Sequence, residues 1–400
     1  KRIWQTTASF RRTTLLSPER LVTRQEWLDR VAQIRPILEA HAESSDAQGT
    51  LATPSVEALR EIGIFRLKVP KELGGFEADP ILQMEVVEAV SYIHPSSGWC
   101  TMIGAGSAAH PSAHLSEEGA DRVFGNGTRP IFAGSFFPAG VATPTDGGYV
   151  VNGRWKFASG VRHADWVHPG AVVDNGDTPN NGKPPEVIDV VVPASAIEIH
   201  DNWQVMGLKG TGSCDFTIAD VFVPRSMTYI KDRVAPKPLR GGPLFRLAVP
   251  AFFAGEHIGF AAGVARRALD ELVETATARR SKWRNSSLAD RPSVHRIVGE
   301  LDLKLRAARA LAFEFYENLW ARLCQGETIS HADHVESKLI ATHITELAVE
   351  ITTQAFRYGG GGALYSPNIL DTLMRDMNAG AQHIMFSDAS YEDHGRVLLG

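Results

Sequence analysis

The chain is poor in cysteine, and its three residues of this type, Cys100, Cys214 and Cys324, form no CxxC pair. A disulfide framework and a thiolate metal site are therefore both disfavoured. The simplest interpretation is that the thiols are buried and that the protein works in a reducing, cytoplasmic compartment.

Long apolar runs and a strong excess of charge are missing as well. The longest apolar stretch, residues 245–264, is interrupted by Arg246, Glu256 and His257, whereas a transmembrane helix needs about 18 consecutive apolar residues. The formal net charge is only -5, and lysine and arginine are dispersed along the chain, so no broad positive field attracts nucleic acid. We expect a protein that binds neither membrane nor nucleic acid.

The fingerprints of common phosphate-binding and catalytic sites do not occur. There is no GxxxxGKS/T, no GxGxxG between a strand and a helix, no GxSxG and no HExxH, which disfavours P-loop, Rossmann, α/β-hydrolase and zinc-protease chemistry. His331, His334 and His343 lie close together, but charged residues alternate with them. This pattern is typical of a solvated helix face, so we expect no metal site.

The chain does contain three blocks, the first and last with helical spacing of apolar residues and the middle one with the alternation of β-strands. At the start, apolar residues such as Trp27, Val31 and Ile34 recur every three or four positions, which indicates amphipathic helices. Over residues 130–224, β-branched and aromatic residues alternate in short runs between turn signals, as in β-strands. Helical spacing then returns over residues 248–284, 294–325, 331–358 and 369–387.

These blocks predict an α+β protein of several domains. We expect an N-terminal α-helical domain over residues 24–128, a central β domain over 129–240 and a C-terminal helical bundle over 241–400. Residues 1–23 are basic and hydroxyl-rich, a composition shared by transit peptides and by plain tails, and we expect a tail. Within the β domain, Asn152-Gly153 predicts a hairpin turn, since both residues tolerate positive φ.

Five sequence blocks point to a known family. In chain order they are KVPKELGG, GGYVVNGRWKFASG, WQVMGLKGTGSCDFTIADVFVP, AAR at residues 307–309, and YGGGGALY followed by LMRD. Each resembles the corresponding block of the acyl-CoA dehydrogenase superfamily, and together they cover almost the whole chain. The resemblance implies an N-terminal α-helical domain, a central β-barrel-like domain and a C-terminal four-helix bundle. It also implies a homotetramer with flavin bound between the β domain and the helices.

Two departures from the dehydrogenase pattern favour a different branch of this superfamily. The catalytic glutamate of many dehydrogenases would fall on Ile384, eight residues after Asp376, although Glu256 is an alternative base on another helix. The usual TExxxGSD string is also altered. Three segments instead resemble the oxygenase components of two-component flavin monooxygenases that hydroxylate phenols: residues 159–166, 201–213 and 375–383.

This second resemblance implies an activity. The enzyme would receive reduced FMN or FAD from a separate flavin reductase. With O2, and through a C4a-hydroperoxyflavin, it would hydroxylate a small aromatic substrate, phenolic or polyketide-like. Two alternatives stay open: an acyl-CoA dehydrogenase, and a flavin-free structural relative that keeps the fold for assembly.

The same resemblance assigns roles to single residues. His383 would be the substrate-side base, a role that suits histidine because it titrates near neutral pH. Ser159 would be the partner of flavin N5, and His110 a further active-site histidine or, alternatively, a helix-end residue that caps carbonyl groups. The implied flavin-binding residues are Ser135, Phe157, Ser159, Arg279, Gly360 and Gly361.

Simpler interpretations exist for some of these residues. The strand that contains Phe157 could merely bury its aromatic side chains. The glycines of residues 359–362 could merely end a helix. His163 could lie behind the site or at the surface.

Overall fold

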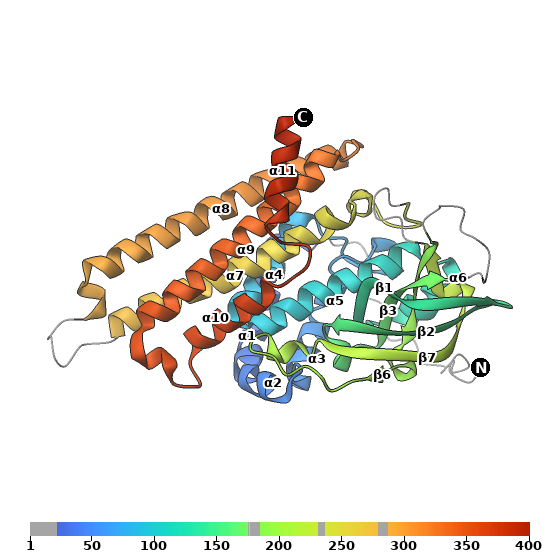
Figure 1. The fold of residues 1–400 in the computed structure, drawn as a ribbon, viewed down its shortest axis with the longest axis horizontal. Helices are drawn as coiled ribbons and strands as arrows, with labels where there is room; N and C mark the ends of the chain where they lie inside the picture. Colours follow the sequence, from blue (N-terminus) through green and yellow to red (C-terminus); the bar gives the residue numbers. More distant parts are fainter. Residues whose placement is uncertain (1–21, 175, 177–184, 231–236, 279–286) are drawn as a thin grey trace.

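The computed structural model describes residues 22–174, 176, 185–230, 237–278 and 287–400, which form a helical body beside a β-sheet (Figure 1). Nearly all of the predicted tail, residues 1–23, lies outside the described residues, as does Arg279. The α-helices that precede the sheet are α1 (Arg24–Ala40), α2 (Ala42–Gln48), α3 (Thr53–Glu61), α4 (Pro80–Ile93), α5 (Pro95–His114) and α6 (Glu117–Phe124).

Capping residues explain where two of these helices begin. The side chain of Thr23 accepts a hydrogen bond from the backbone N–H of Glu26, whose carboxylate accepts from Thr23 in return. Asp79 accepts from the N–H of Leu82 directly before the proline that starts α4. Each cap satisfies an N–H group that the helix itself leaves unpaired and is worth about 1 kcal/mol.

The β part is one mixed sheet that is not closed into a barrel. Its strand order is β6-β7-β2-β1-β3-β4-β8, with β5 paired to β3, so that among the described residues β6 and β8 are the edges. β1 and β3 run parallel, and the other pairs are antiparallel. The strands are β1 (Phe132–Thr145), β2 (Gly148–Ala158), β3 (Trp166–Val173), β4 (Val187–Val190), β5 (Val192–Pro193), β6 (Glu198–Ile199), β7 (Cys214–Pro224) and β8 (Thr228–Ile230).

The hairpin prediction at Asn152-Gly153 is wrong. β1 and β2 are joined instead through Asp146 and Gly147, which has φ +77°. Asn152 and Gly153 lie inside β2, where the register toward β7 shifts, and the Asn152 side chain exchanges two hydrogen bonds with Asp220 of β7. The Asn-Gly pair therefore marks a bulge, which is the other place in a sheet that favours such residues.

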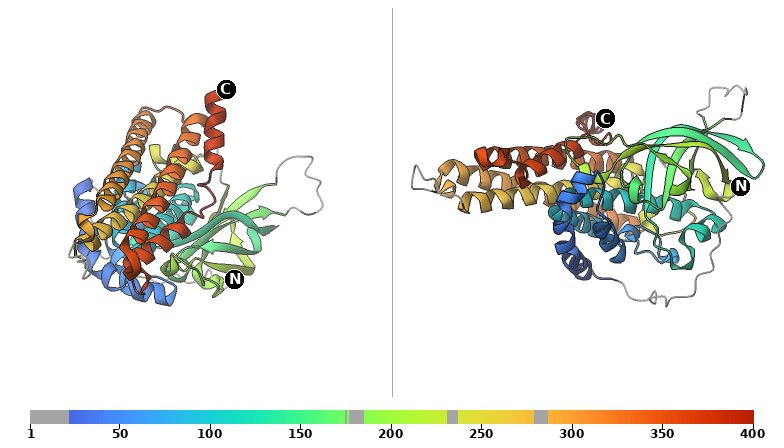
Figure 2. Two further views of the ribbon diagram at one scale, coloured as in Figure 1. Left: turned by 60° about the vertical axis from the view of Figure 1, so that its left-hand side comes forward. Right: turned by 90° about the horizontal axis from the view of Figure 1, so that it is seen from below.

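The helices that follow the sheet are α7 (Val249–Ala278), α8 (Pro292–Cys324), α9 (His331–Gly359), α10 (Ile369–Gly380) and α11 (Ala389–Leu399). The long helices α7, α8 and α9 lie side by side, and two further views show the sheet at one end of this bundle (Figure 2). Helix α7 also packs against α4 and α5, which puts it at the centre of the helical body.

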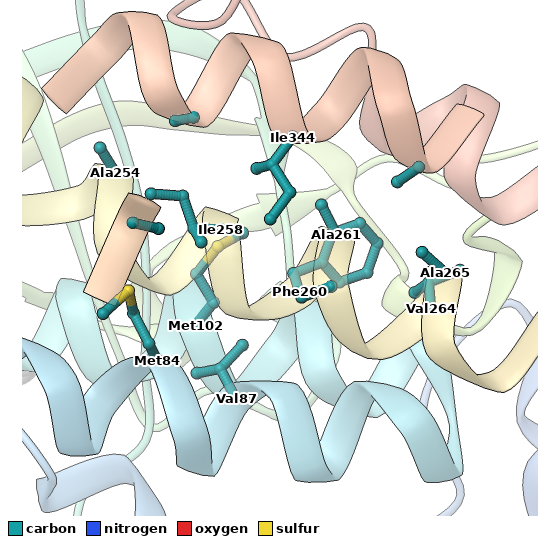
Figure 3. Packing of buried hydrophobic residues seen from close by; sticks show 14 of the residues in the cluster. Met84, Val87, Met102, Ala254, Ile258, Phe260, Ala261, Val264, Ala265 and Ile344 are labelled. Atoms are coloured by element: carbon teal, nitrogen blue, oxygen red, sulfur yellow. The ribbon is translucent and has the colours of Figure 1, made fainter. Parts of the chain in front are cut away.

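The largest hydrophobic cluster is built around α7 (Figure 3). Met84 and Val87 from α4, Met102 from α5 and Ile344 from α9 pack against this helix, and Phe260 of α7 is fully buried among them. Burying a side chain of this size stabilises the fold by about 1.5–3 kcal/mol. Because α7 is covered on several sides, even its polar residues are withdrawn from water.

The helix predicted over residues 369–387 is too long. α10 ends at Gly380 and turns follow it before α11 begins. Gly380 packs so closely against α7 that a Cβ would come within 2.7 Å of the Phe260 ring. The apolar spacing does continue beyond this point, but Phe386 is buried while Ile384 is 87% exposed. The spacing of apolar residues after Gly380 therefore does not distinguish a continued helix from turns in which only some apolar side chains are buried.

The prediction of buried thiols is correct for Cys100 and Cys214, but Cys324, the last residue of α8, is exposed. None of the described helices is both long and apolar enough to cross a membrane. Within the same part of the chain, no group of three or more His, Cys, Asp or Glu side chains is arranged to hold a metal ion.

Replacing Gly153 by alanine should destabilise the protein more than replacing Gly147. A Cβ at Gly153 would lie 2.6 Å from the Cα of Gly140 inside the sheet, and such overpacking costs about 2–3 kcal/mol. A Cβ at Gly147 would meet nothing within 4 Å, so only its positive φ is penalised, by about 1 kcal/mol. Denaturant unfolding measures both values, and equal losses would contradict the inference.

Candidate active site

Ser159 lies just after β2, where the sheet meets α5. Its Oγ accepts a hydrogen bond from the indole Nε1 of Trp99 on α5 (3.0 Å) and lies 2.7 Å from the Oγ of Ser213. Ser213 Oγ in turn lies 2.7 Å from Thr211 Oγ1, which donates to the carbonyl of Leu208 (2.8 Å). We call this continuous set of bonds, from Trp99 to Leu208, the hydroxyl chain.

The two ends of the hydroxyl chain set the direction of its protons. A hydroxyl group has one proton to donate. The Thr211 hydroxyl donates its hydrogen bond to the Leu208 carbonyl, so it can only accept from the Ser213 hydroxyl. Ser213 therefore donates to Thr211 and accepts from Ser159. Because Ser159 donates to Ser213 and accepts from Trp99, its Oγ retains one lone pair and no further proton.

Phe157 is turned out of the sheet by an irregular strand end. The register between β2 and β7 shifts between Trp155 and Ala158, and Phe157 has φ +59°, which is unfavourable for a side chain of this size. Its ring is 70% exposed and meets the ring of Trp203 edge to face, with centroids 6.3 Å apart. The simpler interpretation, that this strand buries all its aromatic residues, thus holds for Trp155 and is wrong for Phe157.

Ser135 lies in the first part of β1, which pairs with β3, and its partner there is Pro169. The pairing of β1 with β2 begins further along, at Gly140. Ser135 is half-buried and borders an irregularity in the pairing of β1 with β3. Gly360 and Gly361 lie elsewhere, in the turn after α9, where a Cβ on either would meet nothing within 4 Å.

His383 lies in the turns that follow α10, next to Trp99. The centroids of the two rings are 5.9 Å apart, and His383 Nδ1 accepts a hydrogen bond from the N–H of Met385 (3.4 Å). Burial lowers the pKa of His383 to about 4, so the imidazole is neutral at pH 7. Since Nδ1 accepts, the proton of the neutral ring is on Nε2.

His257 is a polar residue of this region that the sequence did not single out as a site candidate. It is fully buried on α7, stacks on Phe386 with ring centroids 4.2 Å apart, and lies 5.6 Å from the His383 ring. Neither of its ring nitrogens has a hydrogen-bond partner among the described residues. Burial and the neighbouring His383 hold its pKa well below the usual value. The available signal was the Glu256-His257 pair within the apolar stretch of residues 249–265.

His110 is buried and His163 is half-buried. His110 lies against the rings of Phe252 and Phe253, eleven residues after Trp99 on α5 and hence about 16 Å further along that helix. His114, the last residue of α5, lies with its Nδ1 3.0 Å from the carbonyl oxygen of His110. Burial and the Arg60 charge lower the pKa of His163 to about 4.

Glu256, the alternative base, is held in a fully buried ion pair. Its Oε2 lies 2.8 Å from Lys68 Nζ, and Lys68 also donates to the carbonyl of Phe252 (2.6 Å). Burial raises the pKa of Glu256 and lowers that of Lys68, and each charge partly offsets the shift of the other. With aliphatic Ile384 at the first position and Glu256 bound to Lys68, neither position offers a carboxylate that is free to abstract a proton.

Comparison with known proteins decides the family. Models of the acyl-CoA dehydrogenase N-terminal and C-terminal domains match residues 24–122 and 257–388. Indole-3-acetate monooxygenase of Pseudomonas putida is 31% identical over 362 residues, which are 89% of each chain. The chain belongs to the acyl-CoA dehydrogenase family. The family and the fold inferred from the sequence are therefore confirmed.

Two further relatives fix the branch of the family. The oxygenase subunit HsaA of a flavin-dependent monooxygenase from Rhodococcus jostii is 28% identical over 366 residues, 89% of this chain and 93% of that protein. The crystal structure of 3-HSA hydroxylase from Rhodococcus sp. RHA1 superposes with a TM-score of 0.85 at 26% identity, covering 94% of this chain and 97% of that one. Within the family, the chain is a flavin-dependent monooxygenase.

The buried ion pair yields a stability prediction. Lys68→Met alone should lower the free energy of unfolding by about 3–5 kcal/mol, because it leaves the Glu256 carboxylate buried without a partner. Lys68→Met combined with Glu256→Leu should recover most of this loss, since no charge is then buried. Denaturant unfolding of both variants checks the pair. A double variant as unstable as the single one would show that the two side chains do not act together.

Proposed function

We propose that the chain is the oxygenase component of a two-component flavin-dependent monooxygenase. It uses reduced FMN or FAD, delivered by a separate flavin reductase, and O2 to hydroxylate a small aromatic substrate of phenolic or polyketide-like type. The observation that carries this proposal is the contact of half-buried, neutral His383 with buried Trp99, which bonds to Ser159. The two positions considered for a dehydrogenase base hold Ile384 and the salt-bridged Glu256.

The residues around Ser159 fit a flavin. The exposed face of Phe157, with Trp203 at its edge, offers an aromatic surface to a planar ring system. The lone pair of Ser159 Oγ offers a hydrogen-bond acceptor to flavin N5, and we assign a further flavin contact to the hydroxyl of Ser135 on β1. When bound, reduced flavin supplies the electrons that activate O2. For the phosphate end of the cofactor we propose Arg279, Gly360 and Gly361.

His383 orients the substrate. Its neutral ring can donate a hydrogen bond from Nε2 to a substrate oxygen, which favours the phenolate character that makes an aromatic ring reactive toward an electrophilic oxygen. It can act as a base only after releasing the Met385 N–H from Nδ1. His110, about 16 Å further along α5, contributes to the far end of the substrate pocket.

The proposed assembly is a homotetramer in the cytoplasm. Leu303 and Leu311 are exposed along the outer helix α8 (Figure 1) and provide apolar surface for contact with other copies. Reduced thiols are consistent with the proposed compartment, since all three cysteines are free.

His383→Ala should uncouple oxygen use from hydroxylation. With a flavin reductase, NADH and a panel of phenols and indole-3-acetate as probes, we expect product formation to fall about 100-fold, the usual contribution of a positioned acid or base. Consumption of NADH should change little, and H2O2 should replace the product, because Ser159 and Phe157 are untouched. Product, H2O2 and NADH are measured in the same reactions.

The wild-type protein provides the test of the function itself. Hydroxylated product that depends on both reductase and O2 is the expected result. Bleaching of bound oxidised flavin by an acyl-CoA without any reductase would establish a dehydrogenase instead. A protein that binds neither reduced nor oxidised flavin would be a structural relative without this activity. Equal losses of product and of NADH consumption in His383→Ala would refute the orienting role.

A further inference from the structure

The hydroxyl chain depends on the segment of residues 206–213, here called the 206–213 loop, which precedes β7. The loop supplies Thr211, Ser213 and the terminal carbonyl of Leu208. Leu208 has φ +52°, a conformation that costs a non-glycine residue about 1–3 kcal/mol and persists only where the surrounding structure imposes it. Something outside the loop must therefore hold it in place.

Two carboxylates from the helical body hold the loop by its backbone. Asp376 on α10 accepts a hydrogen bond from the N–H of Leu208 (2.6 Å), and Asp46 on α2 accepts from the N–H of Gly210 (2.9 Å). Gly207 packs directly on α10, since a Cβ there would come within 2.1 Å of the Arg375 carbonyl. Hydrogen bonds from two separate helices, α2 and α10, thus hold the loop in place.

The burial of the Asp376 carboxylate lowers the stability of the folded state. Asp376 is 2% exposed, and its Oδ2 has no hydrogen-bond partner among the described residues. The adjacent Arg375 does not neutralise it, because this guanidinium bonds to Asp371 and to the Met206 carbonyl. A buried carboxylate with one oxygen unpaired is costly, so a neutral acceptor would serve stability better. An ionisable carboxylate at this buried position therefore points to a role other than stability.

The charges that face Asp376 come from three elements. Burial raises the pKa of Asp376, and the charge of Asp46 on α2 raises it further. The Leu208 N–H, Arg375 on the same helix and Lys209 in the loop lower it, and the resulting pKa is about 7. His94 faces Asp46 (4.0 Å), but burial lowers the pKa of this histidine, so it adds no charge at neutral pH. Asp376 therefore changes its charge near pH 7.

We propose that Asp376, together with Asp46, is a positioning residue of the oxygenase: the two carboxylates latch the 206–213 loop and through the hydroxyl chain set the orientation of Ser159. An ionised carboxylate accepts a stronger hydrogen bond than the neutral acid. The latch is closed above about pH 7 and loosens below it. The catalytic part of this inference rests on the proposed function, whereas the closure of the loop does not.

Hydrogen exchange of the loop tests the latch in the flavin-free, full-length protein. After correction for intrinsic rates, the peptide that covers residues 206–213 should exchange about tenfold more slowly at pH 8 than at pH 6. Asp376→Asn, which keeps an acceptor oxygen but cannot ionise, should lose this pH dependence. Asp376→Ala should exchange about tenfold faster than wild type at pH 8. Asp46→Asn removes the charge that raises the pKa of Asp376, so its transition should move to lower pH.

Global stability separates positioning from a merely structural role. The folded-state pKa of Asp376 is raised above the ordinary 3.8, so the folded state binds more protons than the unfolded state between about pH 4 and 7. The free energy of unfolding contributed by this group therefore falls as the pH rises through that window, while the protection of the loop increases. A residue that served stability alone would move both in the same direction.

The ratio of product to H2O2, measured with reductase and the aromatic probes, links the latch to the reaction. Asp376→Ala should lower this ratio about tenfold at pH 8, and Asp376→Asn should keep it while losing its pH dependence. The control is Asp302→Asn, whose carboxylate pairs, in the described part of the chain, with Arg266 of α7 and Arg306 of α8. This variant should match wild type in both assays.

Each outcome decides one part of the inference. Wild-type loop exchange in Asp376→Ala overturns the latch, whatever the activity. A loosened loop with an unchanged ratio of product to H2O2 overturns the link to Ser159. If even wild type forms no product, the proposed function fails, and the exchange data still decide whether the latch exists. Should Asp376→Ala fail to fold, exchange in Asp376→Asn that keeps the wild-type pH dependence overturns the proposal.

Discussion

The site depends above all on the burial of α7. Helices α4, α5 and α9 cover it (Figure 3), and the close contact of Gly380 with Phe260 places the end of α10 against it as well. A helix confined in this way cannot shift without opening cavities, each of which costs several kcal/mol. His257 and the ring of Phe260 therefore have fixed places, and the neighbouring His383 and Trp99 rings take theirs from them.

A few hydrogen bonds from the helical body fix the position of the neighbouring part of the sheet. Trp99 reaches Ser159, and Asp376 and Asp46 reach the backbone of the loop before β7. These contacts join residues that are 60 to 168 positions apart in the sequence. The site is accordingly a property of the interface between the helices and the sheet, and neither part contains it alone.

Much of the fold could be predicted from the sequence, and candidate residues for the site could be named, because sequence blocks and apolar periodicity are local signals. The family blocks led to the fold and pointed to Ser159 and His383. The hairpin at Asn152-Gly153 failed because a bulge selects the same residues as a turn. His257 and Asp376 gained no role from the sequence, since their significance is burial without a full set of partners, which only the packed structure determines. The exposure of Phe157 likewise follows from a register shift that no local pattern encodes.

The fixed direction of the hydroxyls beside β2 has a consequence for which form of the coenzyme is retained. A reduced isoalloxazine bears a hydrogen on N5, whereas the oxidised ring presents a lone pair at the same position. In the proposed site, the Ser159 oxygen already donates its only proton within the hydroxyl chain. It therefore attracts the N5–H of the reduced ring and repels the N5 lone pair of the oxidised ring. The pocket would thus discriminate between the redox states of the flavin. It would bind the reduced form and release the oxidised form, without any ionised side chain at N5.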